Sequence, residues 1–317
     1  MSPAPTSVVA PGGETSERPA PAGAGDAQHH RHHQGHVARP AQRANFHARL
    51  IVEPTPTGYS PFVLVAIDHV IIACADPDGA AADLEAALGL GATGGGRHDA
   101  HGTYNRLIWL GDSYVELMGV FDAALAADSW WGAHMARLLT GAAAAYAGLA
   151  LASDDLLADI ERLRAIGAPI SDPIAGERRR PDGELVRWRI ARLAQPEPEL
   201  GLTFLIEHDP TSAEWGAQDR AARAGQVHPI GTPARLALVE LPVTDVRATT
   251  LRLLRQLGLQ FRPSLAGRGA RDTSIGRQTL RLSGEAGQPG ITVRAGGAAR
   301  QAQLLGCRWS VAPISMG

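Results

Sequence analysis

The sequence predicts an α+β fold built from repeated β-α-β-β-β units, and three observations support this prediction. Short strand-like apolar runs alternate with one helix at a time, and this arrangement recurs along the chain. In each copy an aspartate before the expected helix and a glycine after it are separated by the same interval: Asp76 to Gly89, Asp154 to Gly167 and Asp245 to Gly258. Aspartate caps a helix N-terminus, and glycine ends a helix in the left-handed conformation. Further strand-like runs then follow each glycine.

Residues 1–62 form the expected leader. They are rich in Pro, Ala, Gly and polar residues and carry almost no periodic apolar pattern. Such a segment cannot bury enough surface to offset the entropy cost of ordering, so we predict that it is disordered. Two interpretations of the histidine cluster between His29 and His36 are open. Either it chelates metal ions loosely, or it is low-complexity sequence without a function.

Composition narrows the class of protein. A chain of 317 residues, 44% of them hydrophobic, can form one large or a few small globular units. The net charge of −2 gives no broad surface for nucleic acid or anionic lipid, and the run Arg178-Arg179-Arg180 is expected at a solvated hairpin tip. No stretch reaches the roughly 18 apolar residues of a membrane helix, and Cys74 and Cys307 cannot form a disulfide framework. We expect a cytoplasmic protein that binds neither nucleic acid nor membrane.

Three units follow the leader. Residues 63–125 form the first β-α-β-β-β unit and residues 126–212 the second, and residues 63–212 together form the expected functional domain. Residues 230–317 form a degenerate third unit, which ends in an unpatterned tail after Gly297. The third unit is therefore expected to be structural, or to serve as a lid or dimer element.

Two ionisable residues interrupt apolar runs of the first unit. His69 lies within Ile67-Asp68-His69-Val70-Ile71-Ile72, and Glu116 lies within Tyr114-Val115-Glu116-Leu117-Met118. A buried histidine and a buried carboxylate each cost several kcal/mol unless they are paired or coordinated. Taken alone, His69 is more simply a hydrogen-bonded core residue. The matching Glu116 and the repeat favour a shared divalent metal.

These motifs resemble those of a known family. A repeated unit with a histidine in its first strand and a glutamate in its last resembles the vicinal oxygen chelate superfamily. More narrowly, Ile67 to Ile72, Gly102-Thr103-Tyr104-Asn105-Arg106-Leu107 and Leu110-Gly111-Asp112-Ser113-Tyr114-Val115-Glu116-Leu117 are similar to the glyoxalase-like domain family, of the glyoxalase, bleomycin-resistance and dioxygenase type. The resemblance implies paired units whose curved mixed sheet surrounds a cleft.

The resemblance also implies a ligand set, because that superfamily holds its metal with side chains from the first and last strands of each unit. Carried over to this chain, it implies His69 and Glu116 from the first unit and Glu207 from the second. The second unit departs from the pattern, since the position that corresponds to His69, counted back from Asp154, is Ala147. One nitrogen and two oxygen donors suit Zn, Mn, Ni, Co or Fe(II), and they leave coordination positions open for water or substrate.

The third unit lacks both metal ligands, because it has Leu238 and Thr292 at the positions of His69 and Glu116.

The number of histidines bears on the type of reaction. An extradiol ring cleavage would be expected to use two histidines and one carboxylate. The single histidine of the implied set argues against that chemistry, unless His98, His101 or His208 joins it.

Four residues are candidates for substrate binding. Tyr104, Asn105 and Arg106 begin the next strand of the first unit, where Arg106 would bind a carboxylate or carbonyl. His101 lies in a glycine-rich segment that either presents it to the cleft or forms a mobile loop. Trp130-Trp131 either line an apolar pocket or pack the connecting helix against a sheet.

The predicted function is therefore that of a glyoxalase-like protein. A divalent metal would bind adjacent oxygens of a small substrate and polarise a carbonyl in a lyase or isomerase reaction, with Glu207 or Glu116 as the proton-transfer base. The alternative is a non-catalytic ligand-binding or sequestering protein of the bleomycin-resistance type. The expected partner is a small molecule, and a homodimer is left open.

Overall fold

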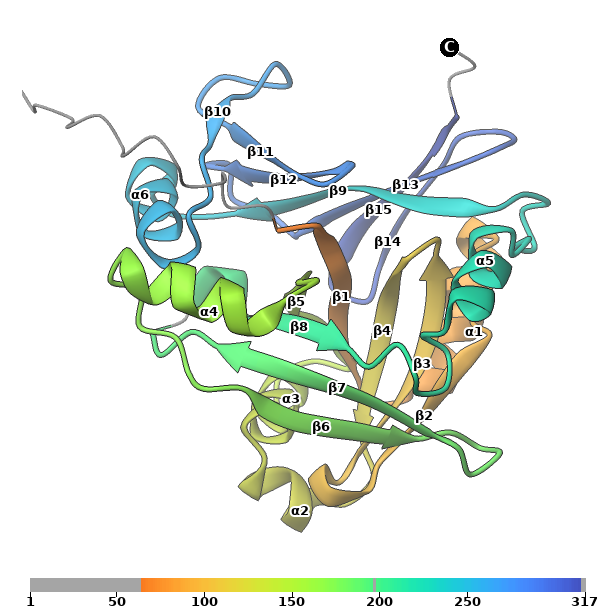
Figure 1. The fold of residues 1–317 in the computed structure, drawn as a ribbon. Helices are drawn as coiled ribbons and strands as arrows, with labels where there is room; N and C mark the ends of the chain where they lie inside the picture. Colours follow the sequence, from red (N-terminus) through yellow and green to blue (C-terminus); the bar gives the residue numbers. More distant parts are fainter. Residues whose placement is uncertain (1–63, 196–197, 315–317) are drawn as a thin grey trace, which may run out of the picture. The chain divides into compact units, whose positions relative to one another are not determined.

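The structure is a computed structural model, and it describes residues 64–195 and 198–314 (Figure 1). The predicted leader, residues 1–62 with its histidine cluster, lies outside the described residues. The predicted α+β fold of repeated β-α-β-β-β units is confirmed. None of the described helices combines the length and apolar character needed to cross a membrane.

A closed barrel is formed by strands β1 to β8, in the order β1-β4-β3-β2-β6-β7-β8-β5 (Figure 1). In each half the first and last strands run parallel, β1 with β4 and β5 with β8, and the halves meet where β1 pairs antiparallel with β5. The halves also meet on the opposite side of the barrel, where β2 pairs antiparallel with β6 at Arg97 and Arg179. The strands are β1 (Ala66–Cys74), β2 (Gly94–His98), β3 (Thr103–Leu110), β4 (Ser113–Val120), β5 (Ala144–Ala152), β6 (Ile174–Arg179), β7 (Leu185–Arg192) and β8 (Leu202–His208).

The helices begin and end near the predicted residues. In α1 (Pro77–Leu88) the Asp76 carboxylate accepts from two backbone N–H groups, and Gly89 ends the helix at φ 70°. Helix α6 (Val246–Leu257) is likewise capped by Asp245 and Gly258. Helix α4 (Leu156–Ala165) is capped by Asp155 and not by the predicted Asp154, because the first helical turn starts one residue later. Helices α2 (Ala123–Asp128) and α3 (Trp130–Leu139) connect the barrel halves, and α5 (Ala217–Ala224) follows β8.

The C-terminal residues form a second sheet, in the order β10-β11-β12-β9-β13-β15-β14. This order repeats that of the barrel: β9 runs parallel to β12, pairs antiparallel with β13, and β13 runs parallel to β15. The third unit therefore has all of its elements, and a fourth unit of three strands, without a helix, follows it. The strands are β9 (Ala234–Pro242), β10 (Arg262–Pro263), β11 (Arg271–Ile275), β12 (Gln278–Ser283), β13 (Gly290–Ala295), β14 (Arg300–Leu304) and β15 (Cys307–Pro313).

Two sequence-based expectations about this region are wrong. The chain after Gly297 is not unpatterned, because β14 and β15 form a hairpin there. Thr292 does not correspond to Glu116, because its strand β13 starts the fourth unit and β12 is the last strand of the third. Glu116 lies opposite Ile71 in the parallel pair β1–β4, and the corresponding pair in β9–β12 is Glu240 with Arg281. Neither Arg281 nor Leu238 is a metal ligand.

One apolar core joins the two sheets. Alternate residues of β1, such as Val70 and Ile72, point away from the barrel interior and belong to the same buried cluster as Val239 and Leu280 of the C-terminal sheet. The Gln278 side chain adds polar contacts: it accepts from the Ile67 N–H at 2.7 Å and donates to the Ser113 hydroxyl at 2.5 Å. The C-terminal sheet thus supports the strand that carries His69.

Gln278→Leu is expected to lower the free energy of unfolding by about 1–3 kcal/mol, because it leaves the buried Ile67 N–H without its partner. Urea denaturation measures the change. The control is Gln303→Leu, at an exposed position of β14, for which we expect less than about 0.5 kcal/mol. Equal stability of the wild type and Gln278→Leu would contradict the supporting role of this contact.

Candidate functional site

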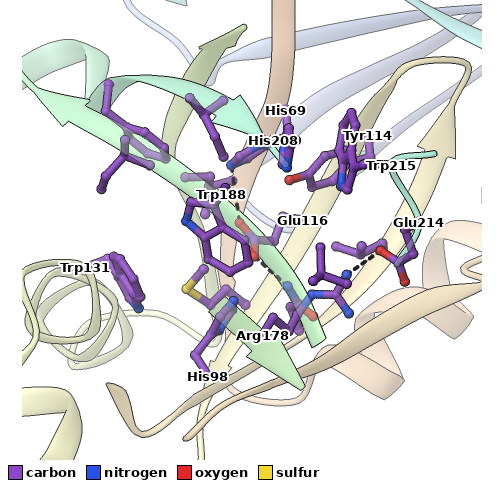
Figure 2. A pocket seen from close by; sticks show the side chains of 18 of the residues that line it. His69, His98, Tyr114, Glu116, Trp131, Arg178, Trp188, His208, Glu214 and Trp215 are labelled. Atoms are coloured by element: carbon purple, nitrogen blue, oxygen red, sulfur yellow. Dashed lines mark hydrogen bonds and ion pairs between the residues drawn. The ribbon is translucent and has the colours of Figure 1, made fainter. Parts of the chain in front are cut away.

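The interior of the barrel contains a cavity of about 50 Å³. Side chains of a strand alternate between the two faces, so every second residue of each strand points inward. Figure 2 shows these side chains converging on the interior. The lining residues come from both halves: His69, Ile71, His98, Asn105, Leu107, Trp109, Tyr114, Glu116, Met118, Trp131, Met135, Arg178, Val186, Trp188, Ile190, Phe204, Ile206, His208, Glu214 and Trp215.

A belt of aromatic and histidine rings runs around this cavity, and each ring contacts the next. Centroid distances along the belt range from 3.4 Å, between His208 and Trp215, to 6.5 Å, between Trp188 and His208. In order, the rings are Trp131, His98, Trp188, His208, Trp215, Trp109, Tyr114, His69, Phe204 and Trp130, which returns to Trp131. The belt gives the cavity flat aromatic walls, between which its polar side chains lie.

The polar centre of the cavity is a row of four side chains. The Asp68 carboxylate lies 2.7 Å from Nδ1 of His69, and Nε2 of His69 lies 3.5 Å from Oε2 of Glu116. Nδ2 of Asn105 donates to Oε1 of Glu116 at 2.6 Å. All four residues are buried. Two carboxylates therefore flank one imidazole in an apolar site.

A β-bulge explains how neighbouring residues Asp68 and His69 serve the same site. The register between β1 and β5 shifts between Ile67 and His69, which leaves Asp68 as the extra residue of the strand. A bulge turns a side chain away from the usual alternation. Asp68 thereby contacts both His69 and His208, whose Nε2 lies 3.1 Å from the same carboxylate oxygen. The predicted motif contained Asp68, but the alternation of a regular strand would have pointed it away from the site.

Strand β8 brings His208 into the cavity in place of Glu207. Phe204, Ile206 and His208 line the interior, so Glu207 points to the outer face by alternation. There Glu207 forms an ion pair with Arg189 at 2.5 Å. The structure therefore brings together two of the three predicted metal ligands, His69 and Glu116, and separates Glu207 from them.

The predicted substrate-binding residues are also divided. Asn105 lies in the cavity, where it contacts Glu116. Arg106 points outward from β3 and pairs with Asp78, and Tyr104 is half-buried on the same outward face. His101 packs against Trp131 at 4.0 Å and lines an open groove on the outer surface of the barrel.

An ion pair between Arg178 and Glu214 forms part of the cavity wall (Figure 2). Nη2 of Arg178 lies 2.5 Å from Oε2 of Glu214, and the Arg178 side chain is 4% exposed. Nη1 of Arg178 also donates to the carbonyl of Gly95. The expectation of a solvated arginine run is therefore wrong for Arg178, because β6 alternates: Arg178 points inward, whereas Arg179 is exposed.

Burial sets the charge states of the cavity. Burial, together with the nearby charge of Arg178, lowers the pKa of His98 to about 3. Burial also lowers the pKa of His208, although the Asp68 carboxylate opposes that shift. Burial alone would raise the pKa of Asp68, but its interactions with His208 and His69, including a hydrogen bond from each ring, lower it below its usual range. At neutral pH the site therefore contains an ionised Asp68 and neutral His98 and His208.

The low pKa of His98 predicts a loss of stability in mild acid. The unfolded chain binds a proton on this residue near pH 6.5, whereas the folded chain does not until about pH 3, so stability falls as pH decreases through that window. The expected slope is at most about 1.4 kcal/mol per pH unit for one group. Urea unfolding of His98→Gln at pH 7 and pH 5 should show a smaller loss than the wild type. Identical losses would mean that His98 is protonated in the folded protein.

The second half of the barrel lacks ligands at the positions that match His69 and Glu116. Counted from the helix caps Asp76 and Asp155, His69 corresponds to Gly148 and not to Ala147. Glu116 lies opposite Ile71, and Phe204 lies opposite the corresponding Ala150. Glycine and phenylalanine bind no metal.

The residues of the cavity do not fit a resident metal held by three side chains. A catalytic zinc site uses three protein ligands, whereas here only His69 and Glu116 of the implied set meet. Within residues 64–195 and 198–314, no group of three or more His, Cys, Asp or Glu side chains is arranged to hold a metal ion. We therefore derive no reaction step through a metal.

Comparison with known proteins agrees with the fold. A model of the glyoxalase-like domain matches residues 67–257, and a search of curated proteins finds no match. A hypothetical protein from Staphylococcus aureus is similar in structure, with a TM-score of 0.64 and 16% identity, over 78% of this chain and 99% of that one. At this identity the likeness shows the fold alone.

Two methylmalonyl-CoA epimerase structures are similar over a smaller part of the chain. The enzyme from Mycobacterium tuberculosis has a TM-score of 0.37 and 25% identity, over 48% of this chain and 95% of that one. A single-residue variant of the enzyme from Streptomyces coelicolor, in complex with 2-nitronate-propionyl-CoA, has a TM-score of 0.35 and 23% identity, over 45% and 96%. The family match spans more than half of the chain, so this protein belongs to the glyoxalase-like domain family, in the vicinal oxygen chelate superfamily.

Proposed function

We propose that this protein binds a small carbonyl compound inside the barrel and moves a proton on it, in an isomerase or lyase type of reaction. The observation that carries the proposal is the row Asp68–His69–Glu116, in which one imidazole lies between two carboxylates in an apolar cavity. A positioned acid–base pair in a water-poor site is suited to removing a proton next to a carbonyl group.

In this proposal each side chain of the row has a role, which its hydrogen bonds support. Ionised Asp68 can only accept, so Nδ1 of His69 donates to it, and in the neutral ring Nε2 then carries the lone pair. Nε2 is therefore the base that takes the proton from carbon. Asn105 donates to Oε1 of Glu116, so Oε2 remains next to His69. Oε2 stabilises the imidazolium that forms and exchanges the proton with it. Asp68 fixes the tautomer and orientation of the imidazole, the role of the buried aspartate in a Ser-His-Asp triad.

Hydrogen–deuterium exchange in D₂O tests this proposal without knowledge of the natural substrate. Full-length protein is incubated with small ketones, such as hydroxyacetone, methyl isobutyl ketone, dimethylaminoacetone and laevulinate, and NMR follows the signals of the protons next to each carbonyl. We expect faster exchange than with heat-denatured protein for at least one ketone. Exchange no faster than with denatured protein, for ketones that bind, would contradict the proposal.

A second candidate function is ligand sequestration without chemistry. It is favoured by the second half of the barrel, where Gly148 and Phe204 occupy the positions of His69 and Glu116. A sequestering protein would bind a ketone or another small molecule, quench the tryptophan fluorescence of the belt and show no exchange. Ligand binding with exchange distinguishes the first function from the second.

A further inference from the structure

We propose that the ligand of the barrel cavity carries a positive charge: it is a small molecule with an ammonium group beside its carbonyl. This inference rests on the proposed function for the carbonyl part of the ligand. The cation is inferred separately, from the charges and hydrogen-bond acceptors of the interior.

The centre of the cavity has more negative than positive groups. Asp68 and Glu116 flank His69 and form no ion pair with an arginine among the described residues, since Arg178 and Arg180 pair with Glu214 and Arg223 packs over Trp109 and Trp215. Because His98 and His208 are neutral at pH 7, these two carboxylates outnumber the cations at the centre whether or not His69 carries a proton. A buried surplus of negative charge is costly unless a cation enters.

Arg178 is not free to bind an anionic ligand. Its two terminal nitrogens bond Glu214 and the carbonyl of Gly95. A ligand carboxylate would have to displace the Glu214 side chain, which is 13% exposed, and would leave it with Arg180 as its remaining partner. The positive charge in the cavity wall is thus neutralised by the protein itself.

Two residues that line the cavity have acceptor atoms available to a donor. Oε2 of Glu116 remains after Asn105 has occupied Oε1. His208 donates its Nε2–H to Asp68, so Nδ1 of this neutral ring is an acceptor, and this buried atom has no hydrogen-bond partner among the described residues. An ammonium group has donors and no acceptor, which matches this pair.

The aromatic belt favours the same charge. Trp188 lines the cavity beside His208, which it meets in an edge contact, whereas the Trp215 ring is stacked on His208 and also packs against Arg223. A desolvated cation gains from contact with tryptophan faces, and a neutral group of the same shape does not. The cavity volume of about 50 Å³ admits only a small ligand, and the flexible side chains of Met118 and Met135 in its wall can adapt to one of a few heavy atoms.

The test compares three ketones that differ in charge: dimethylaminoacetone, which is cationic, methyl isobutyl ketone, which is its neutral isostere, and laevulinate, which is anionic. Tryptophan fluorescence of the full-length protein at pH 7 gives each dissociation constant. We expect the cation to bind at least about tenfold more tightly than the neutral isostere, and the anion more weakly than both. In Glu116→Gln this preference should fall to about threefold or less, whereas Glu177→Gln, on the outer face of β6, should keep it.

Each outcome has a defined meaning. Equal binding of the cation and the neutral ketone, tighter binding of the anion, or no binding of any of the three overturns the inference. A preference that persists in Glu116→Gln and vanishes in Glu177→Gln would place the cation outside the barrel and also overturns it. A preference for the cation without deuterium exchange supports the inference and refutes the proposed catalytic function, so the two failures are distinguishable.

Discussion

His69→Gln is expected to lower the rate of deuterium exchange by a factor of about 10² to 10⁴, the usual contribution of a positioned general base. Glutamine keeps a polar side chain of similar length but cannot take a proton from carbon, and Asp68 would still receive a hydrogen bond. The rate is measured by NMR on the ketone that exchanges fastest with the wild type.

Two controls accompany this variant. Urea denaturation shows whether His69→Gln is still folded, and dissociation constants for the ketones show whether the cavity still binds them. His134→Gln serves as the matched control, because His134 lies on α3 and bonds the carbonyl of Ala147 outside the cavity lining. A folded, ligand-binding His69→Gln protein with wild-type exchange would exclude His69 as the base.

Arg178→Met is expected to lower the free energy of unfolding by about 3 kcal/mol, the lower end of the cost of breaking a buried ion pair, because the largely buried Glu214 carboxylate then keeps only Arg180, at 3.5 Å, as a partner. Urea denaturation at pH 7 measures the loss. The double variant Arg178→Met/Glu214→Met should recover a large part of it, since an apolar pair leaves no uncompensated charge.

Arg179→Met provides the neighbouring control. Its side chain is 52% exposed and pairs with exposed Asp99 at 3.3 Å, so we expect a change of at most about 1 kcal/mol. A loss in Arg178→Met no larger than in Arg179→Met would mean that the inward ion pair does not stabilise the barrel.

The sequence predicted the fold well where local signals repeat. The spacing of Asp76 from Gly89 and of Asp245 from Gly258 marked two helices, whose caps are now confirmed. The fourth unit was missed because it has no helix, and therefore no cap residues, between β13 and β14. Strands alone give a weaker signal, and only their pairing in the sheet shows where one unit ends.

The sequence located part of the site, because a polar residue within an apolar strand is informative in a single chain. His69 and Glu116 meet in the cavity, as expected from two ionisable residues that each interrupt an apolar run. Glu207 and His208 are adjacent, and a shift of one residue reverses the direction of a strand side chain. The resemblance pointed to Glu207 by residue type, and the register of β8 selects His208.

Other site residues had no signal of their own. Asp68 depends on a bulge whose position is set by the pairing of β1 with β5. Arg178 stands in a run of three arginines, and its inward direction follows from barrel closure next to Gly95. Glu214 comes from the segment after β8, and a partner far away in sequence cannot be read from local pattern.

Deuterium exchange by full-length protein from which metal has been removed with EDTA, with metal content determined by elemental analysis, tests whether the side chains of the cavity move the proton without a metal. We expect exchange to persist when the metal content is far below one ion per chain, because His69, Glu116 and Asp68 move the proton themselves. Loss of exchange on metal removal, restored in proportion to added divalent ion and absent in His69→Gln, would contradict this expectation and would establish His69 as a metal ligand.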